Sequence, residues 1–384
     1  MTKLKYYFLV FLLSSNLALS TYLALCCGMH NPKTPLTVPI KVGANITLTG
    51  PIAYWGQQVK KGLDLAVSEA NRNKPVRPIE LVYQDNQGEA KNAIGIFQRF
   101  TSVDNVSAVI SIFTPVSKPL RSIAAQSKVP LLATVVSSVG FGLENEWSFR
   151  DFPSQTQQAT AIAEYAYNQY ALKKAATLVV NDDYGRDGEE VFTQTFTKLG
   201  GTVVAKDTVD QKATDIRSQL QKLLSAKPDV IFMVVRDSTL GMAVKQAREL
   251  RFTGKIIGVN AFDAPVVWEA AGNAGNGVIF TSAYIDFEGN SEAKDFGVTY
   301  RMAYKEEPDW VSVYGYTIGK YIFEIASESN GDATALRDKL ANMHVDSIRG
   351  ELRMNTSRDV VSPIAIYQRK DGINVFLKKI LPTE

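Results

Sequence analysis

The sequence predicts an α/β protein with two similar lobes, each built around a parallel sheet. Three observations carry this prediction. Short apolar runs rich in β-branched residues alternate with helical patterns along the body of the chain. This alternation starts twice, once at Lys41 and again at Ala175. The chain has 384 residues, of which 45% are hydrophobic, and this is enough apolar material for two cores.

The first unit extends from Lys41 to Gln87 and predicts a strand, a loop, a helix and a second strand. The strand Lys41–Thr47 ends in a Thr-Gly-Pro turn, which a Tyr-Trp-Gly step follows at residues 54–56. Apolar residues recur at helical spacing within Gln57–Arg72, and Ile79–Gln84 is the next apolar run. Open α/β sheets place their ligands beyond the carboxyl ends of strands, so this loop is a candidate ligand site.

The remaining elements follow the same alternation. Further strands are expected at Ser107–Phe113, Pro130–Val136, Ala175–Asn181, Thr202–Thr208, Val230–Val235, Lys255–Val259 and Gly277–Ser282. Further helices are expected at Ala90–Thr101, Lys118–Ser127, Gln157–Gln169, Gly188–Leu199, Asp215–Ser225, Leu240–Leu250 and Val266–Ala271, with a late pair at Glu292–Lys305 and Ser312–Ser327. A sheet-like section from Gly350 to Leu377 ends the chain. This order predicts parallel sheets with right-handed crossovers.

The chain is expected to pass between the lobes more than once, which gives a hinge and a cleft. Residues Phe149–Gln158 separate the two sets of strands and are interpreted as one crossing segment. The predicted N-terminal lobe is 40–152 plus 284–357, and the predicted C-terminal lobe is 153–283 plus 358–384.

The first 27 residues are typical of an export signal. Lys3 and Lys5 precede an uncharged, largely apolar stretch that contains both cysteines of the chain, Cys26 and Cys27. A lipoprotein signal with lipidation at Cys26 or Cys27, simple cleavage near Ser20, and an uncleaved anchor are the three alternatives. Each places the body outside the cytoplasm, behind a polar, proline-rich tether at residues 28–39.

The composition argues against several classes of function. The formal net charge is only +3 and no basic cluster is legible, so no nucleic-acid partner is expected. The sequence has no phosphate-binding P-loop, no G-x-S-x-G elbow and no C-x-x-C pair. His30 and His344 are the only histidines, so the sequence offers few residues for a catalytic triad or a histidine-rich metal site. We therefore expect no enzyme, no metal and no cofactor.

Polar and aromatic residues follow several of the predicted strands. Hydroxyl groups at the carboxyl end of a strand suit a ligand carboxylate, and the ordinary alternative is helix capping. An aromatic side chain there can cover a ligand or pack its own loop, and a charged one can simply be solvated. The residues concerned are Tyr54, Trp55, Thr114, Ser117, Ser137, Ser138, Tyr184, Arg236, Asp237 and Asp263.

An ordered series of motifs resembles one family along nearly the whole body, about Val38 to Leu377. The motifs are LTGPIAYWGQQVKKGLDLAV, YQD, VPLLA, FRDFPSQTQQ, VVNDDYGRDG, KPDVIF, KQARELRFTGKIIG and EPD. They resemble the type I periplasmic binding proteins, specifically the branched-chain amino-acid (Leu/Ile/Val-binding) family of ABC-transporter receptors. The resemblance implies two Rossmann-like, doubly wound lobes joined by three crossing strands that close on a ligand without catalysis.

The resemblance also implies roles for individual residues. Trp55 matches an aromatic that flanks the ligand, and Tyr184 matches the tyrosine of the second lobe that closes over it. Thr114 matches a carboxylate-binding serine, and Val135 and Ser137 match backbone and hydroxyl contacts of the next loop.

Two positions depart from the family pattern. Pro115 interrupts the serine-rich turn and removes a backbone N–H donor. Asn260 stands where amino-acid-binding members place an acid for the α-ammonium group, and an amide carries no compensating charge. Asp237 or Asp263 could compensate. These departures argue against a plain leucine-type ligand. We expect a small polar ligand of the amino-acid, amide or carboxylate type.

These expectations describe an extracytoplasmic substrate-binding protein of an ABC importer, in the periplasm or cell envelope. We expect a monomer whose partners are a small molecule and an inner-membrane permease, with membrane contact only through an N-terminal lipid or anchor. One alternative is a ligand-free, bilobed lipoprotein that regulates an envelope enzyme. A hydrolase-like enzyme is a third, which the missing elbow and histidine disfavour.

Overall fold

The computed structural model describes residues 38–72, 75–285 and 290–381. Residues 39–384 form one compact unit. The predicted signal, both lipidation candidates Cys26 and Cys27, and nearly all of the tether lie outside the described residues. Within the part of the chain that is described, no helix has the length and apolar character needed to cross a membrane.

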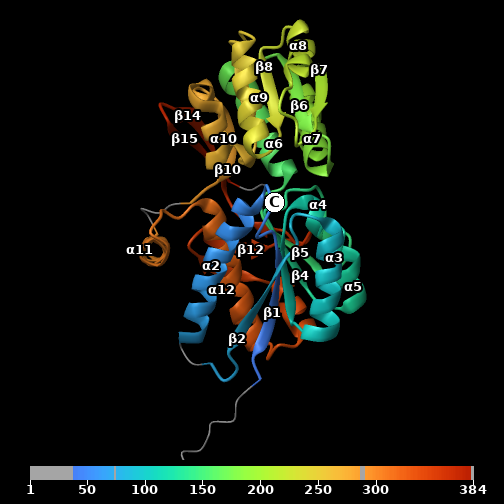
Figure 1. The fold of residues 1–384 in the computed structure, drawn as a ribbon, viewed down its shortest axis with the longest axis vertical. Coiled ribbons are helices and arrows are strands. Elements are labelled where there is room, and N and C mark those ends of the chain that lie inside the picture. The colour runs from blue at the N-terminus through green and yellow to red at the C-terminus, as the bar shows by residue number, and fades with distance from the viewer. Residues whose placement is uncertain (1–37, 73–74, 286–289, 382–384) are drawn as a thin grey trace, which may run out of the picture. The chain divides into compact units, whose positions relative to one another are not determined.

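A five-stranded parallel sheet forms the core of the first lobe. Its order is β2-β1-β3-β4-β5, with bounds Ile79–Asp85, Ile40–Ile46, Ala108–Ile112, Leu131–Thr134 and Ser148–Asp151. Strands β3 and β4 are buried along their whole length, as expected when helices cover both faces. The pairs α2 (Ala53–Arg72) with α12 (Trp310–Glu328) and α3 (Ala90–Arg99) with α5 (Leu120–Ser127) flank the sheet on opposite sides (Figure 1).

Strand β5 corrects the sequence prediction, which assigned this segment to the crossing between lobes. Residues Ser148–Asp151 instead pair in parallel with β4 and form the edge of the sheet. The strand is short and polar, so hydrophobic alternation does not reveal it. Its last two residues are buried and oppositely charged. Arg150 pairs with Asp359 at 2.5 Å, and Asp151 accepts two hydrogen bonds from Arg349 at 2.6 and 2.7 Å.

A seven-stranded sheet forms the core of the second lobe. Its order is β15-β14-β10-β9-β8-β6-β7, with bounds Ile373–Ile380, Ile364–Lys370, Ile279–Ala283, Lys255–Gly258, Val230–Val234, Lys174–Val180 and Thr202–Val209. Strands β14 and β15 are antiparallel, so the sheet is mixed and the prediction of purely parallel sheets is wrong here. The two strands form a hairpin after the last helix, and a hairpin needs no crossover.

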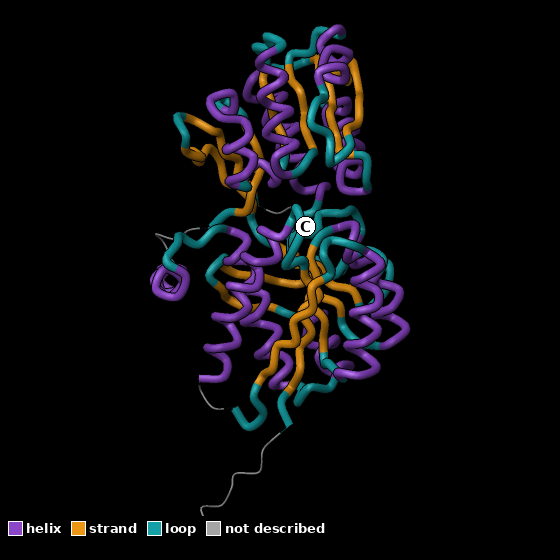
Figure 2. Tube along the Cα trace, viewed as in Figure 1, coloured by secondary structure: helices purple, strands orange, loops and turns teal. Residues whose placement is uncertain are grey.

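Helices pack around this second sheet in two groups (Figure 2). Helix α6 (Gln155–Tyr170) contacts α7 (Asp183–Lys198), whereas α9 (Asp237–Glu249) contacts α8 (Arg217–Ser225) and α10 (Pro265–Ala271). Helix α7 begins five residues before the predicted start. The carboxylate of Asp182 accepts a hydrogen bond from the backbone N–H of Gly185 at 3.1 Å and caps the first turn. The two-lobed α/β architecture predicted from the sequence is confirmed, and the lobe boundaries stay a prediction.

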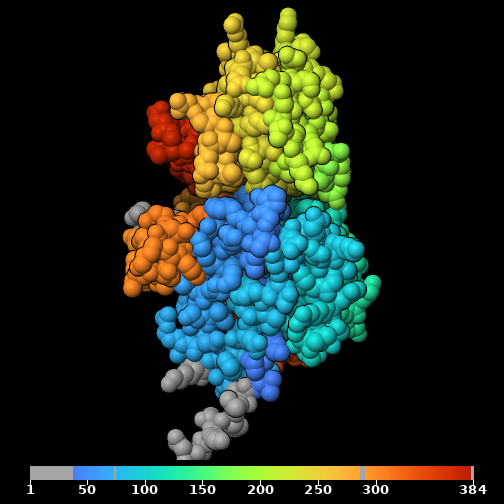
Figure 3. Space-filling model, in the orientation of Figure 1, coloured from blue at the N-terminus to red at the C-terminus, as the bar shows by residue number. Residues whose placement is uncertain are grey.

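The short helix α4 (Thr114–Ser117) follows β3. The other remaining helices and strands belong to the late part of the chain: α11 (Ser291–Tyr304), α13 (Ala333–Ala341), and a small antiparallel sheet of β11 (His344–Ser347), β12 (Gly350–Met354) and β13 (Val360–Val361). Helix α11 buries one apolar face and leaves further apolar side chains exposed on the other. Phe296 and Tyr300 are buried, whereas Val298 and Met302 are 50% and 69% exposed, and the helix stands out at the surface in Figure 3.

Candidate functional site

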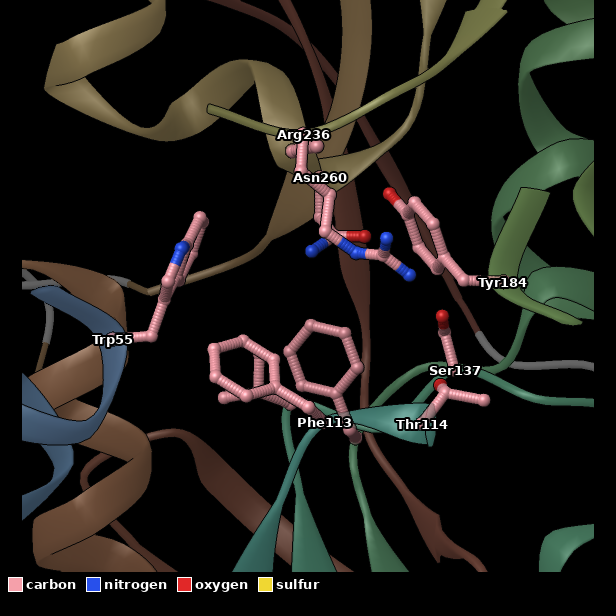
Figure 4. Close-up of a pocket in the computed structure, with 10 residues that line it drawn as sticks. Trp55, Phe113, Thr114, Ser137, Tyr184, Arg236 and Asn260 are labelled. Carbon is pink, nitrogen blue, oxygen red and sulfur yellow. The ribbon is translucent and has the colours of Figure 1, made fainter. Parts of the chain in front are cut away.

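One pocket collects residues from the ends of strands of both sheets (Figure 4). It encloses about 350 Å³ of empty space, counted with its mouth. The residues that line it are Trp55, Phe113, Thr114, Val135, Ser137, Phe152, Tyr184, Arg236, Asn260 and Ala261. All but Trp55 lie within four residues of the end of β3, β4, β5, β6, β8 or β9, which is where ligands of open α/β sheets bind.

Two lining residues have strained backbone. Phe113 directly follows β3 with φ of 69°, and Val135 directly follows β4 with φ of 53°. Positive φ is unfavourable for residues other than glycine, and most of all for a β-branched residue such as valine. Such strain persists only where the surroundings enforce it, and it clusters at binding sites. Here it turns the chain sharply at the ends of two adjacent strands.

Two hydroxyl groups of the pocket wall are available for a ligand. Within the described residues, no hydrogen bond engages the side chains of Thr114 and Ser137, although both residues are at most 3% exposed. Ser117 differs because its hydroxyl bonds that of Ser111 at 2.9 Å. Ser138 is buried but does not line the pocket.

Trp55 forms one side of the pocket from the first turn of α2, rather than from the loop predicted for it. A Cβ atom on the next residue, Gly56, would lie 1.8 Å from the backbone oxygen of Thr47. Only glycine therefore lets this turn pack so closely on the end of β1. The indole Nε1 of Trp55 donates a hydrogen bond to the carboxylate of Asp237 at 3.0 Å.

Asp237 lies behind Trp55 and is not part of the pocket wall. It is 9% exposed, and its φ is 52°. Burial raises the pKa of the Asp237 carboxyl, while the bond from Trp55 and the charge of Arg236 act in the opposite direction. Its second oxygen has no partner among the described residues.

Tyr184 is the counterpart of Trp55 in the second lobe. It lies in the first turn of α7, and Gly185 follows it. A Cβ atom on Gly185 would lie 2.0 Å from the backbone oxygen of Val180, at the end of β6. The phenol is 6% exposed, and its hydroxyl has no partner within the described residues. Burial raises the pKa of Tyr184.

Arg236 is a pocket residue that the predicted site did not include. Its guanidinium lies over the ring of Tyr184, with 4.2 Å to the ring centre, and donates to Asp182 at 2.7 Å. From sequence, a charged residue after a strand is most simply a solvated one. The signal that could have found it is its position just beyond β8, the strand beside β6.

Asn260 and Asp263 follow β9 and separate in the structure. Asn260 lines the pocket, and its side-chain oxygen is buried without a partner among the described residues. Asp263 points elsewhere. It accepts hydrogen bonds from Ser282 at 2.6 Å and from Asn374 at 2.8 Å. Burial raises the pKa of Asp263 to about 6.

The structure thus brings six of the eight predicted ligand-binding residues to one pocket wall, while Asp237 and Asp263 lie outside it. The six are Trp55, Thr114, Val135, Ser137, Tyr184 and Asn260. Sequence reasoning missed Phe113, Phe152 and Ala261, and it noted Arg236 beyond a strand without counting it among the ligand-binding residues. Among the described residues, no group of three or more His, Cys, Asp or Glu side chains could hold a metal ion.

Comparison with known proteins assigns the family. Residues 39–372 match the family described as periplasmic binding protein. The chain belongs to this family. Specifically, it is a type I periplasmic binding protein of the branched-chain amino-acid family. Proteins of this family bind substrates for ABC transporters and are not enzymes.

Several relatives and solved structures illustrate the similarity. The Leu/Ile/Val-binding protein homolog 3 of Brucella melitensis is 28% identical over 262 residues, which cover 67% of this chain and 70% of that protein. The leucine binding protein LivK of Thermotoga maritima superposes with a TM-score of 0.83 at 24% identity, covering 89% of this chain and 99% of that one.

The similar structures include proteins solved with ligands. LivJ of Streptococcus pneumoniae, in complex with isoleucine, has a TM-score of 0.83 at 22% identity and covers 90% of this chain and 100% of that one. A solute binding protein of Rhodopseudomonas palustris BisB5, in complex with 3,4-dihydroxy benzoic acid, has a TM-score of 0.80 at 25% identity and covers 90% and 98%.

Proposed function

We propose that this protein captures a small carboxylate, amide or amino-acid ligand outside the cytoplasm by lobe closure and delivers it to an ABC permease. The observation that carries the proposal is a pocket with walls from both sheets and two unengaged hydroxyl groups, about 350 Å³ in size when the open solvent space at its mouth is included. A carboxylate offers several acceptor positions and accepts hydrogen bonds from such hydroxyl groups.

The ligands of related proteins support the carboxylate part of this proposal. LivJ holds isoleucine and the Rhodopseudomonas protein holds 3,4-dihydroxy benzoic acid, and both molecules carry a carboxylate. In our proposal the carboxylate binds Thr114, Ser137 and the backbone near Val135. Trp55 and Tyr184 enclose the ligand body from opposite lobes, and Asn260 contributes from the second.

Lobe closure is the second part of the proposal. Three polar contacts join elements of the two sheets around the pocket: Trp55 to Asp237 at 3.0 Å, Lys118 to Asp183 at 2.7 Å, and the Val139 backbone N–H to Asp187 at 3.0 Å. A ligand that touches both walls adds to these contacts only in the closed form. Its differential affinity for that form shifts the population toward closure.

The proposed lobes are residues 40–152 plus 284–357 and 153–283 plus 358–384, and the crossing segments between them act as the hinge. The N-terminal segment would export the body and hold it at the membrane through Cys26 or Cys27, and the body would act as a monomer. Mass spectrometry of the intact mature protein in a membrane fraction tests this part, because lipidation adds a mass that simple cleavage does not.

The central test combines ligand identification with scattering. Native mass spectrometry of the purified protein, before and after denaturing dialysis, identifies any bound small molecule. Small-angle scattering with and without it should then show compaction. Alanine at both Thr114 and Ser137 should weaken binding at least tenfold. If no small molecule binds and scattering is unchanged, the ligand-free regulator of an envelope enzyme becomes the better account.

A further inference from the structure

The charge on the pocket wall is unusual for a site that takes zwitterions. Arg236 is the only charged side chain among the ten described residues that line the pocket. Thr114, Ser137 and Asn260 are neutral, and the remaining members are apolar or aromatic. The Arg236 charge is already paired with Asp182, but the wall itself presents no acid. An anionic ligand can accept from the guanidinium N–H groups that Asp182 does not engage, whereas a cationic ligand finds no negative partner on the wall.

Arg236 is held firmly in place. Its side chain is 12% exposed, Asp182 accepts one hydrogen bond from it at 2.7 Å, and Tyr184 supports the flat guanidinium from below. Its backbone oxygen also accepts a hydrogen bond from Gln211 at 2.9 Å. A guanidinium has five N–H donors in a fixed fork, so donors remain beyond the one that Asp182 engages.

None of the three nearby acids, Asp182, Asp237 and Asp263, lines the pocket, and each accepts a hydrogen bond from another residue. Asp182 binds Arg236 and caps α7. Asp263 accepts from Ser282 and Asn374, away from the pocket. Asp237 accepts from Trp55 with one oxygen and is not among the residues that line the pocket, although its other, buried oxygen has no partner within the described residues. A ligand ammonium group in this pocket would therefore be buried without a negative partner on the wall.

The pocket is also polarised. In Figure 4 the guanidinium of Arg236 extends toward the side where Thr114 and Ser137 lie, whereas Trp55 forms the opposite side and Phe113 lies between them. Phe152 adds a further ring to the apolar part of the wall. One end thus offers hydroxyl and guanidinium donors, and the other offers aromatic surface, which suits a flat apolar body.

We propose that the pocket selects small monocarboxylates with an uncharged, flat apolar body, such as arylcarboxylates, over α-amino acids, and that Arg236 is the specificity-determining residue. The ligand carboxylate binds between Arg236 of the second lobe and Thr114 and Ser137 of the first. This inference rests on the proposed capture function and narrows its ligand class.

The test uses ligand pairs that differ only in the ammonium group. Isothermal titration calorimetry at pH 7.4 compares 3-phenylpropanoate with L-phenylalanine and 4-methylpentanoate with L-leucine, with benzoate as the flat reference. We expect each carboxylate to bind at least tenfold more tightly than its amino-acid partner, and benzoate to bind as well. Tighter binding of the amino acids overturns the inference but leaves the capture function standing. If no compound binds at millimolar concentration, the capture function in the proposed form fails instead.

Variants separate recognition from folding. Arg236→Gln should weaken benzoate at least tenfold, and Arg236→Lys should recover only part of this loss, since lysine keeps the charge but not the planar fork. Arg217→Gln removes a half-exposed arginine of the same lobe that does not line the pocket, and it is the matched control. An unchanged benzoate affinity in Arg236→Gln, with an unchanged melting temperature, contradicts the proposal.

Two further variants test whether the pocket lacks an acid that could pair with a ligand ammonium group. Asn260→Asp places a carboxylate on the wall and should raise the affinity for L-phenylalanine while lowering that for 3-phenylpropanoate. Asp237→Asn should weaken both members of the pair equally, because we assign Asp237 to the positioning of Trp55. A selective loss of amino-acid binding in Asp237→Asn would show that this carboxylate reads an ammonium group, and it would overturn the inference.

Discussion

Both lobes line the pocket with an aromatic residue held by the same backbone turn, but the two aromatic residues make different contacts. Each places an aromatic residue and a glycine in the first turn of the helix that follows its first strand: Trp55-Gly56 after β1 and Tyr184-Gly185 after β6. In the first lobe the aromatic group is engaged, because the indole bonds Asp237. In the second, the phenol hydroxyl has no partner among the described residues, and the ring instead supports Arg236. A shared backbone turn thus fixes the position of the ring, and the next neighbours decide its role.

The largest effect is expected at the two glycines. Alanine at Gly56 or Gly185 places a Cβ atom 1.8 or 2.0 Å from a backbone oxygen, so the helix must move away from its strand. The free energy of unfolding should fall by about 3 kcal/mol or more, at or above the upper end for overpacked sites. Urea unfolding measures this. Gly95→Ala is the control, since nothing lies within 4 Å of its Cβ position, and it should raise stability by about 0.5–1 kcal/mol.

The next effect is the pH dependence of stability, which should differ between an acid of the second lobe, Asp263, and one of the first lobe, Asp85. Because burial raises the pKa of Asp263 to about 6, the folded state holds this proton more tightly than the unfolded chain does. Stability should therefore fall as pH rises from about 4 to about 6 and stay lower above that. Asp263→Asn should remove this fall and gain up to about 3 kcal/mol at pH 7. Chemical unfolding at pH 4 and pH 7 measures the difference.

Asp85, at the end of β2 in the first lobe, is the opposite case. Burial alone would raise its pKa, but hydrogen bonds from Thr49, Leu48 and Gln87 lower it overall. It contributes stability that is present above its ordinary pKa and lost as pH falls. Asp85→Asn should therefore destabilise at pH 7 and have a smaller effect at low pH. If Asp85→Asn and Asp263→Asn change the free energy of unfolding at pH 7 in the same direction, the opposite pKa shifts assigned to the two acids are contradicted.

A smaller effect is expected from the indole N–H. Trp55→Phe keeps a ring in the pocket but leaves the buried carboxylate of Asp237 without its donor, which should cost about 1–3 kcal/mol. A double-mutant cycle with Asp237→Asn isolates this bond, and a coupling energy near zero would show that it contributes nothing to stability.

The smallest effect is expected at the phenol. Tyr184→Phe removes a buried hydroxyl that has no partner within the described chain, so stability should stay the same or rise by up to about 1 kcal/mol. Tyr321→Phe is the contrast, because its buried hydroxyl donates to Asp151 at 2.9 Å. Thermal unfolding should show a lower melting temperature for Tyr321→Phe and an unchanged or higher one for Tyr184→Phe.

Much of the fold was predictable because the strands of parallel sheets are continuous apolar runs. All nine strands expected from Lys41 to Ser282 form within a few residues of their predicted bounds. The polar strand Ser148–Asp151 was missed because pairing with β4, and not its own pattern, makes it a strand. The start of α7 was placed late because the capping role of Asp182 outweighs the polar composition of the first turn.

The candidate site was predictable where a polar or aromatic residue beyond a predicted strand also matched the family motif, because position alone left helix capping or loop packing open. Thr114, Ser137 and Tyr184 were named on that ground, and the structure places them on one wall. Phe113 and Phe152 were not named, because the first ends a predicted strand and the second lies in the predicted crossing segment, and neither carries a polar group that would mark it. Arg236 was noted beyond a strand but not assigned to the ligand, because its guanidinium gains its place only from Asp182 and Tyr184, which lie about 50 residues away in the chain.

The end of strand β5 has a consequence for how the chain is made. Arg150 and Asp151 each find their counter-charge near the far end of the sequence, at Asp359 and Arg349. Until those residues emerge, a newly synthesised chain would have to bury two lone charges, at a cost of several kcal/mol each. The first lobe therefore cannot be completed during synthesis before nearly all of the polypeptide has been made. A nascent chain stopped short of residue 349 should remain open to protease at β5, while the second-lobe segments that lie between these partners are free to fold earlier.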